Sequence, residues 1–248
     1  MRKLVYCIPL VLVAGLLIYN YGFAPDDGRA LLGRAIAAHG GEDSLARTRR
    51  GRINGVGSRS TTAHDINFVW EETFHLPDRA KRTIREPWLG EMQATTYLYN
   101  DGKCRIYDGK ELKRTQDVRP GDLQGVTDVL GQLVKMRQAK AALTPLPEIQ
   151  VRGRPAVGFE TDSAEWGKVR LWFLRDRGLL ARMMKKMDGA EGEESVDVEM
   201  LLDDYKEYDG VPMPTRIILM RDGRVSTEMT VKDVKFLDKL DDGVFSPP

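Results

Sequence analysis

The sequence predicts a mainly β protein of the α+β class, in which a curved antiparallel sheet packs against amphipathic helices. Residues 168–236 have the pattern of five successive strands, because apolar and polar side chains alternate along each segment. The pair Asp-Gly recurs between the predicted strands, and it suits tight hairpin turns. One mid-chain segment, residues 123–140, instead has the spacing of an amphipathic helix.

Composition is typical of a folded globular chain. The chain has 248 residues, of which 42% are hydrophobic and 30% are charged, so it can bury a sizeable core. Its formal net charge is +1, from 38 basic and 37 acidic residues, and we therefore expect no nucleic-acid partner. The two cysteines, Cys7 and Cys104, provide neither a disulfide framework nor a zinc site.

The amino-terminal segment, residues 1–25, has the pattern of a signal anchor or a signal peptide. Two basic residues precede residues 4–24, which are uncharged and mostly apolar. About 20 residues of helix match a bilayer core of roughly 30 Å. Pro25 follows the small residues of the only cleavage signal, which favours an uncleaved transmembrane anchor. The basic start stays in the cytoplasm, so residues 26–248 are predicted to be exported as a single β-rich domain.

The first half of the exported part begins with a helix and continues as strands. Asp26 and Asp27 can cap a helix over residues 29–39, which Gly40 and Gly41 end. Residues 79–85 carry charge on both faces, which favours a strand at the edge of the sheet. The other strands of this half are predicted at residues 50–58, 65–75 and 91–99, with a short strand around Cys104 and Ile106.

The second half begins with the mid-chain helix. Thr144 to Pro147 stop that helix, and residues 149–161 predict one or two strands around Gly153. The five-strand run follows, and residues 237–245 form a tail in which Phe245 docks. We expect residues 50–107 and residues 168–236 to form two halves of one sheet, with the mid-chain helix inside the curve.

No motif in the chain carries catalytic chemistry. His39, His64 and His75 lie in separate predicted elements, and no metal-binding spacing connects them. The sequence has no nucleophile elbow, phosphate-binding loop or dinucleotide-binding motif. We therefore expect no catalytic residue, no metal, no cofactor and no enzymatic activity.

Tryptophan and methionine provide the most distinctive apolar side chains. They either fill the core of a large sheet or line an apolar cavity between the sheet and the helices. The strand at residues 168–174 carries apolar bulk on both faces, so one face can pack on helices while the other borders solvent or a ligand. The candidate lining residues are Phe68, Trp70, Trp88, Leu98, Leu130, Leu133, Leu171, Trp172, Phe173 and Met183.

Several segments resemble the lipoprotein-carrier-like superfamily of the LolA/LolB type. They are VRLWFLRDRGLLAR at residues 169–182, DYKEYDGVPMPT at residues 204–215 and VKDVKFLDKLDDGVFSP at residues 231–247. The end of the first helix, AAHGG at residues 37–41, also resembles the opening of exported bacterial members. The resemblance covers most of residues 26–248.

This resemblance implies an unclosed antiparallel β-barrel wrapped around helices, with an apolar cavity between them. Relatives carry lipoproteins or lipids across the periplasm, or sense mislocalised lipoproteins. The predicted anchor departs from the soluble carrier type, and no cysteine occupies the position of a lipidated receptor.

The resulting hypothesis is an envelope protein, tethered to the inner membrane by its amino-terminal helix, that binds a lipid, a lipoprotein acyl chain or another apolar ligand. Its domain lies in the periplasm, and it is secreted there if the signal is cleaved. The alternative is an interaction or sensor domain without a ligand, whose sheet surface or edge binds a protein partner.

Overall fold

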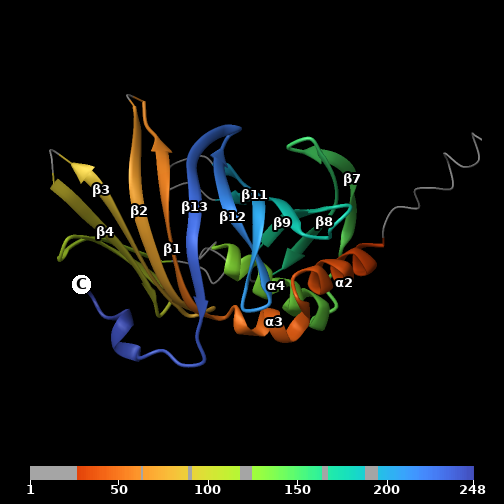
Figure 1. The fold of residues 1–248 in the computed structure, drawn as a ribbon, viewed down its shortest axis with the longest axis horizontal. Coiled ribbons are helices and arrows are strands. Elements are labelled where there is room, and N and C mark those ends of the chain that lie inside the picture. The colour runs from red at the N-terminus through yellow and green to blue at the C-terminus, as the bar shows by residue number, and fades with distance from the viewer. Residues whose placement is uncertain (1–26, 63, 89–90, 118–124, 164–166, 188–194) are drawn as a thin grey trace, which may run out of the picture.

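The fold is built around one large curved sheet with helices inside the curve (Figure 1). The structure, a computed structural model, describes residues 27–62, 64–88, 91–117, 125–163, 167–187 and 195–248. The signal or anchor segment predicted at residues 1–25 lies outside the described residues. Among the described helices, none is long and apolar enough to cross a membrane.

Within the described residues, thirteen strands form a single antiparallel sheet that is not closed into a barrel. The spatial order is β6-β5-β4-β3-β2-β1-β13-β12-β11-β10-β9-β8-β7, so the two halves of the chain meet where β1 pairs with β13. The first half comprises β1 (Arg50–Ser60), β2 (Asp65–His75), β3 (Arg79–Trp88), β4 (Glu91–Asn100), β5 (Lys103–Asp108) and β6 (Glu111–Asp117).

The second half contains the predicted five-strand run, which is confirmed. Its strands are β9 (Gly167–Leu174), β10 (Leu180–Met187), β11 (Val196–Tyr208), β12 (Val211–Arg221) and β13 (Arg224–Phe236). Before this run come β7 (Thr144–Val151) and β8 (Arg154–Ser163), which extend the sheet to its other edge. The mainly β class and the unclosed curved sheet are therefore confirmed.

Among the described residues, three α-helices supply the other layer of the core. They are α2 (Gly28–Ala38), α3 (Gly41–Arg47) and α4 (Val126–Gln138), and α4 lies within the curve of the sheet (Figure 1). Leu130 and Leu133 of α4 are fully buried and belong to the main hydrophobic cluster. This cluster joins the three helices to strands from both halves of the sheet.

The prediction of an edge strand at residues 79–85 is wrong. Strand β3 pairs with β2 on one side and β4 on the other, and the edges are β6 and β7. Charged side chains are accommodated in the interior of the sheet because they pair across strands. Arg82 lies 2.7 Å from Glu72, and Arg85 lies 2.8 Å from Glu71.

Both edge strands differ from the prediction. Strand β6 was not predicted, because its side chains are all exposed and have no apolar alternation. Strand β7 begins at Thr144, in the segment that was predicted only to stop the helix. Pro145 and Pro147 are tolerated there because an edge strand does not need every backbone N–H for pairing.

Aromatic rings of β2 lie over glycines of β1, which explains a strand with few apolar residues. A Cβ atom added at Gly57 would lie 2.4 Å from Cζ of Phe68. A Cβ added at Gly55 would lie 2.8 Å from Nε1 of Trp70, and one at Gly51 would lie 2.9 Å from Cζ of Phe74. The missing side chains of β1 thus make room for the core aromatics of its neighbour.

His39 connects the end of α2 to strand β10 through a hydrogen bond of its ring. Its ring Nδ1 lies 2.8 Å from the carbonyl oxygen of Ala35, and its Nε2 accepts the N–H of Leu180 at 3.4 Å. The hydroxyl of Tyr205 donates to the carbonyl of Leu180 at 2.5 Å, and its ring meets His39 edge-on. Burial lowers the pKa of His39 to about 4, so the ring is neutral at pH 7.

The carboxyl-terminal tail crosses the outer face of β3, β4 and β5. The predicted docking of Phe245 is confirmed, because this ring packs with Leu98 and Tyr107 in a separate hydrophobic cluster. Arg79 lies 5.0 Å above the Phe245 ring and pairs with Asp242 at 2.6 Å. The tail includes a short 3-10 helix, η2 (Asp242–Phe245).

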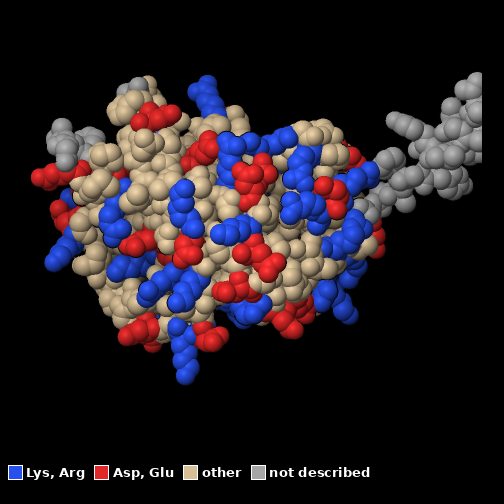
Figure 2. All heavy atoms as spheres, in the orientation of Figure 1, with Lys and Arg blue, Asp and Glu red and all other residues tan. Residues whose placement is uncertain are grey.

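Charges of both signs alternate over the face seen in Figure 2, without a large patch of one sign. Many charged residues of the sheet form cross-strand pairs, such as Arg182 with Glu199 at 2.9 Å and Arg216 with Glu228 at 2.6 Å. The charge on this face is therefore balanced between the two signs.

Candidate functional site: the inner face of the sheet

The inner face of the sheet, which faces α4, leaves a small cavity beside the first turn of that helix. The cavity has a volume of about 50 Å³. Strand alternation places its sheet residues on one face, and α4 closes it with Gly125, Val126 and Thr127. The sheet residues are Ile53, Trp70, Glu72, Phe74, Arg82, Met200, Ile217, Leu219 and Met229.

Most of the cavity wall is apolar and adaptable. Met200 and Met229 enter it from β11 and β13, and the unbranched thioether side chain of methionine adjusts to irregular spaces. The indole N–H of Trp70 is buried and has no hydrogen-bond partner among the described residues. A buried donor without an acceptor carries a desolvation cost. The indole N–H can therefore lower that cost by donating to an acceptor on a ligand.

An ion pair lies at the polar end of the cavity. Arg82 donates from Nε to Oε2 of Glu72 at 2.8 Å, and Glu72 is 8% exposed. Desolvation lowers the pKa of Arg82, but the Glu72 carboxylate together with Tyr99 and Tyr97 raises it by more in total, so the guanidinium stays charged. The pair offers hydrogen-bonding groups to a polar atom of a ligand, and its two opposite charges add no net charge to the apolar wall.

Tyr99 and Cys104 continue this polar strip towards the edge strand β6. Tyr99 shares the inner face with Arg82, and it is paired with Cys104 across β4 and β5. Burial raises the pKa of both groups, so both are protonated at pH 7. A thiol in this state is a weak nucleophile and a poor metal ligand.

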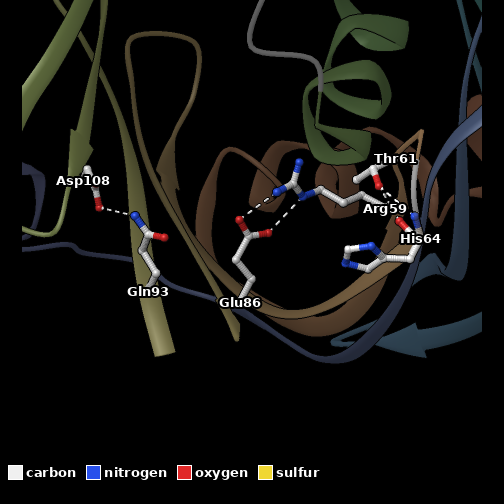
Figure 3. Close-up of polar contacts among 6 residues, drawn as sticks. All are labelled: Arg59, Thr61, His64, Glu86, Gln93 and Asp108. Atoms are coloured by element: carbon white, nitrogen blue, oxygen red, sulfur yellow. Dashed lines mark hydrogen bonds and ion pairs between the residues drawn. The ribbon is translucent and has the colours of Figure 1, made fainter. Parts of the chain in front are cut away.

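The inner face becomes polar again at the opposite end of the strands (Figure 3). The guanidinium of Arg59 binds the Glu86 carboxylate through two hydrogen bonds of 2.9 and 2.8 Å. Gln93 donates to Asp108 at 2.9 Å, which joins β4 to the end of β5. An apolar middle containing Phe68 and Trp70 therefore lies between two polar ends.

The candidate lining residues fall into two groups. Those that lie in the main hydrophobic cluster, on the helices or on the sheet face towards them, are Phe68, Trp70, Leu130, Leu133, Leu171, Phe173 and Met183. Only Trp70 of these borders the cavity, and the rest fill the core. Much of the space between the sheet and α4 is therefore occupied by side chains.

Leu98 and Trp172 lie on the other face of the sheet. Leu98 packs against the carboxyl-terminal tail. Trp172 belongs to a second hydrophobic cluster with Leu174, and these two residues alternate along β9 with Leu171 and Phe173 of the main cluster. The Arg182 guanidinium lies 5.2 Å above the Trp172 ring. The side chain of Trp88 lies outside the described part of the structure.

The cavity residues that sequence reasoning missed come from seven separate elements. Strand alternation does group Phe74 with Trp70, and it indicates that Ile217 and Met229 face one side of their strands. Alternation does not indicate which end of a helix leaves a cavity next to these side chains. Among the described residues, no group of three potential metal ligands lies close enough to hold a metal ion.

Comparison with solved structures assigns the fold. The LolA superfamily protein from Nitrosomonas europaea matches with a TM-score of 0.54 at 15% identity, over 88% of this chain and 97% of that one. A protein described as an outer membrane lipoprotein-sorting protein domain, from Vibrio parahaemolyticus, matches with a TM-score of 0.53 at 12% identity, over 90% and 97%. A DUF1329 family protein from Desulfovibrio piger gives 0.51 at 13% identity, over 90% and 98%.

These structures share one architecture with this chain, so its fold is LolA-like. The predicted resemblance is confirmed at the level of the fold. No protein-family model matches the sequence, and no curated protein matches it either.

Proposed function

We propose that this protein binds a lipid, a lipoprotein acyl chain or another apolar ligand on the inner face of its sheet. The observation that supports the proposal most directly is the methionine-lined cavity between the first turn of α4 and the sheet. The LolA-like fold supports it as well, because the cavity lies between the helices and the curve of an unclosed barrel.

Binding an acyl chain requires this cavity to widen. Pockets that hold drug-sized ligands have volumes of roughly 300 to 1,000 Å³, whereas this one has about 50 Å³. Met200 and Met229 supply adaptable side chains. The N-cap residue of α4 is Gly125, which has no side chain, so no side-chain hydrogen bond caps the first turn of this helix. We infer that the ligand displaces the first turn of α4 from the sheet and replaces its contacts.

Affinity for such a ligand arises mainly from burial of its chain. Each buried methylene contributes about 0.8 kcal/mol, so a long chain needs no charged partner. The Arg82–Glu72 pair remains at the end of the cavity and can donate to a carbonyl oxygen of the ligand. We further propose that residues 4–24 direct export and tether the domain in the periplasm.

Replacing Met229 with glutamate is expected to reduce lipid retention about tenfold or more, since the carboxylate must be desolvated by the acyl chain. The measurement is native mass spectrometry of the full chain after exposure to phospholipid and fatty acid. Met92→Glu is the matched control, because Met92 is 57% exposed on the outer face.

The proposal fails if the wild-type protein retains no lipid and shows no thermal shift with fatty acids. It also fails if Met92→Glu and Met229→Glu reduce retention equally while both proteins melt at the wild-type temperature. Such a result would locate the contact elsewhere on the molecule.

A second candidate function is a protein-interaction domain that binds no lipid. It is favoured by a hollow of about 500 Å³ on the outer face of β1, β2 and β3. Val56, Val69 and Met92 border this hollow and are 39%, 42% and 57% exposed. If this surface carries the function, Met92→Glu abolishes partner binding and Met229→Glu leaves it intact.

A further inference from the structure

A large cleft lies outside the inner face, where α3 meets the ends of β1, β2 and β13. We call it the base cleft, and its volume is about 810 Å³. Leu76 and Phe236 form part of its apolar floor. Six charged residues surround that floor: Arg47, Arg49, Arg50, Asp78, Asp209 and Asp238.

The base cleft collects these charges from segments that are far apart in the sequence. The three arginines come from the end of α3 and the start of β1. Asp78 lies in the turn between β2 and β3, Asp209 in the turn between β11 and β12, and Asp238 just after β13. The fold therefore brings three cations and three anions to one cleft.

These opposite charges do not pair with one another. Arg47 donates to the Ser44 hydroxyl at 3.1 Å, and Arg50 donates to the backbone carbonyl of Asp238 at 2.6 Å. Within the described residues, the guanidinium of Arg49 and the carboxylates of the three aspartates make no hydrogen bond and no ion pair, although the Arg49 backbone carbonyl accepts the N–H of Leu76. Charges on the open sheet surface behave differently, since many of them pair across strands.

We propose that the base cleft binds a zwitterionic phosphate–ammonium group, of the kind carried by phosphoethanolamine head groups. The planar, forked guanidinium groups match the oxygens of a phosphate, and the carboxylates accept the N–H groups of an ammonium. A ligand with phosphate alone would be repelled by the three aspartates, because the lining as a whole carries no excess of positive charge. The proposal is separate from the cavity on the inner face, which takes an apolar chain.

His75 provides a reporter at the wall of this cleft. Its Nδ1 accepts a hydrogen bond from Arg79 at 3.0 Å. Burial lowers the pKa of His75 below 6.5, and Arg50, Arg79 and Arg49 lower it further, while Asp78 opposes them. A phosphate bound among these arginines screens their field, so it raises the pKa of His75 towards its ordinary value.

The experiment titrates the full chain with glycerophosphoethanolamine, which is soluble and has no acyl chain. Calorimetry measures its affinity, and NMR follows the imidazole signals across pH. The chain has three histidines. His64, in the turn between β1 and β2, is the internal control, because that turn is at the other end of β1 from the base cleft.

The expected result is saturable binding with a rise in the pKa of His75 and no change at His64. Arg49→Gln and Asp238→Asn each weaken binding about tenfold, which corresponds to 1.4 kcal/mol. Both residues are exposed, so neither substitution removes a core contact. Arg224→Gln, at an exposed arginine that begins β13 at the far end of that strand from Phe236, leaves the affinity unchanged.

Vesicles of phosphatidylethanolamine distinguish the source of the group. Arg49-dependent binding to vesicles identifies a membrane phospholipid, and binding of the soluble compound alone identifies a free phosphodiester. The proposal is overturned if no binding occurs, if Arg49→Gln binds like the wild type, or if glycerol 3-phosphate binds as tightly as the zwitterion. These results leave the acyl-chain proposal untouched, because the probe carries no chain.

Discussion

Substitution of Gly55 by alanine is expected to lower the free energy of unfolding by about 3 kcal/mol. The new Cβ atom would lie 2.2 Å from the backbone oxygen of Thr230 and 2.8 Å from Nε1 of Trp70. The Thr230 oxygen belongs to the adjacent strand β13, so no side-chain rotation relieves the clash. The register between β1 and β13 shifts at Asn54 and Gly55, which brings the two backbones close at this point.

Gly33→Ala is the matched control and is expected to have the opposite sign. Gly33 lies in the interior of α2, and a Cβ atom there meets nothing within 4 Å. Alanine should therefore raise the free energy of unfolding by about 0.5 to 1 kcal/mol through helix propensity. Urea denaturation of both variants checks the pair, and equal effects at the two sites would contradict the close contact between β1 and β13.

Acidification is expected to remove about 3 kcal/mol of stability through His39 alone. The folded protein holds the pKa of His39 at about 4, below the ordinary 6.5, because burial disfavours the charged ring. The unfolded chain therefore binds a proton at a higher pH than the folded chain does. Stability from this group is complete above pH 6.5, falls as the pH drops from 6.5 to 4, and is lost below pH 4. The magnitude follows from about 1.4 kcal/mol for each pH unit.

The measurement compares urea denaturation of the wild type and His39→Gln at several pH values between 7 and 4. Carboxylates titrate in both proteins, so the difference between the two curves isolates His39. The variant should lose less stability on acidification than the wild type. Parallel curves would show that His39 does not titrate between these pH values.

The parts of the fold that the sequence predicts are those with a local periodic pattern. Strands β9 to β13 follow from alternation and from turns such as Asp222-Gly223, and both residues of that turn have positive φ. Edge strand β6 is not predicted by alternation, because the side chains on both of its faces are exposed. Strand β3 is mistaken for an edge, because its charges pair with residues of β2 that sequence order does not reveal.

The candidate sites depend on contacts between distant segments, which no local pattern specifies. Alternation predicts that Leu171 and Trp172 point to opposite faces, but not which face meets the helices. The cavity on the inner face combines residues from β1, β2, β3, α4, β11, β12 and β13. The base cleft joins Arg49 to Asp238, and neither residue has a sequence motif around it.

Quenching of tryptophan fluorescence by a brominated fatty acid tests the inner-face proposal most directly. Bromine quenches an indole only at short range, and Trp70 and Trp172 lie on opposite faces of the sheet. Two variants of the full chain each retain one of these tryptophans, with phenylalanine replacing the other three. The account predicts strong, saturable quenching of Trp70 and little quenching of Trp172. Equal quenching of both, or quenching of Trp172 alone, would contradict a ligand between the sheet and α4.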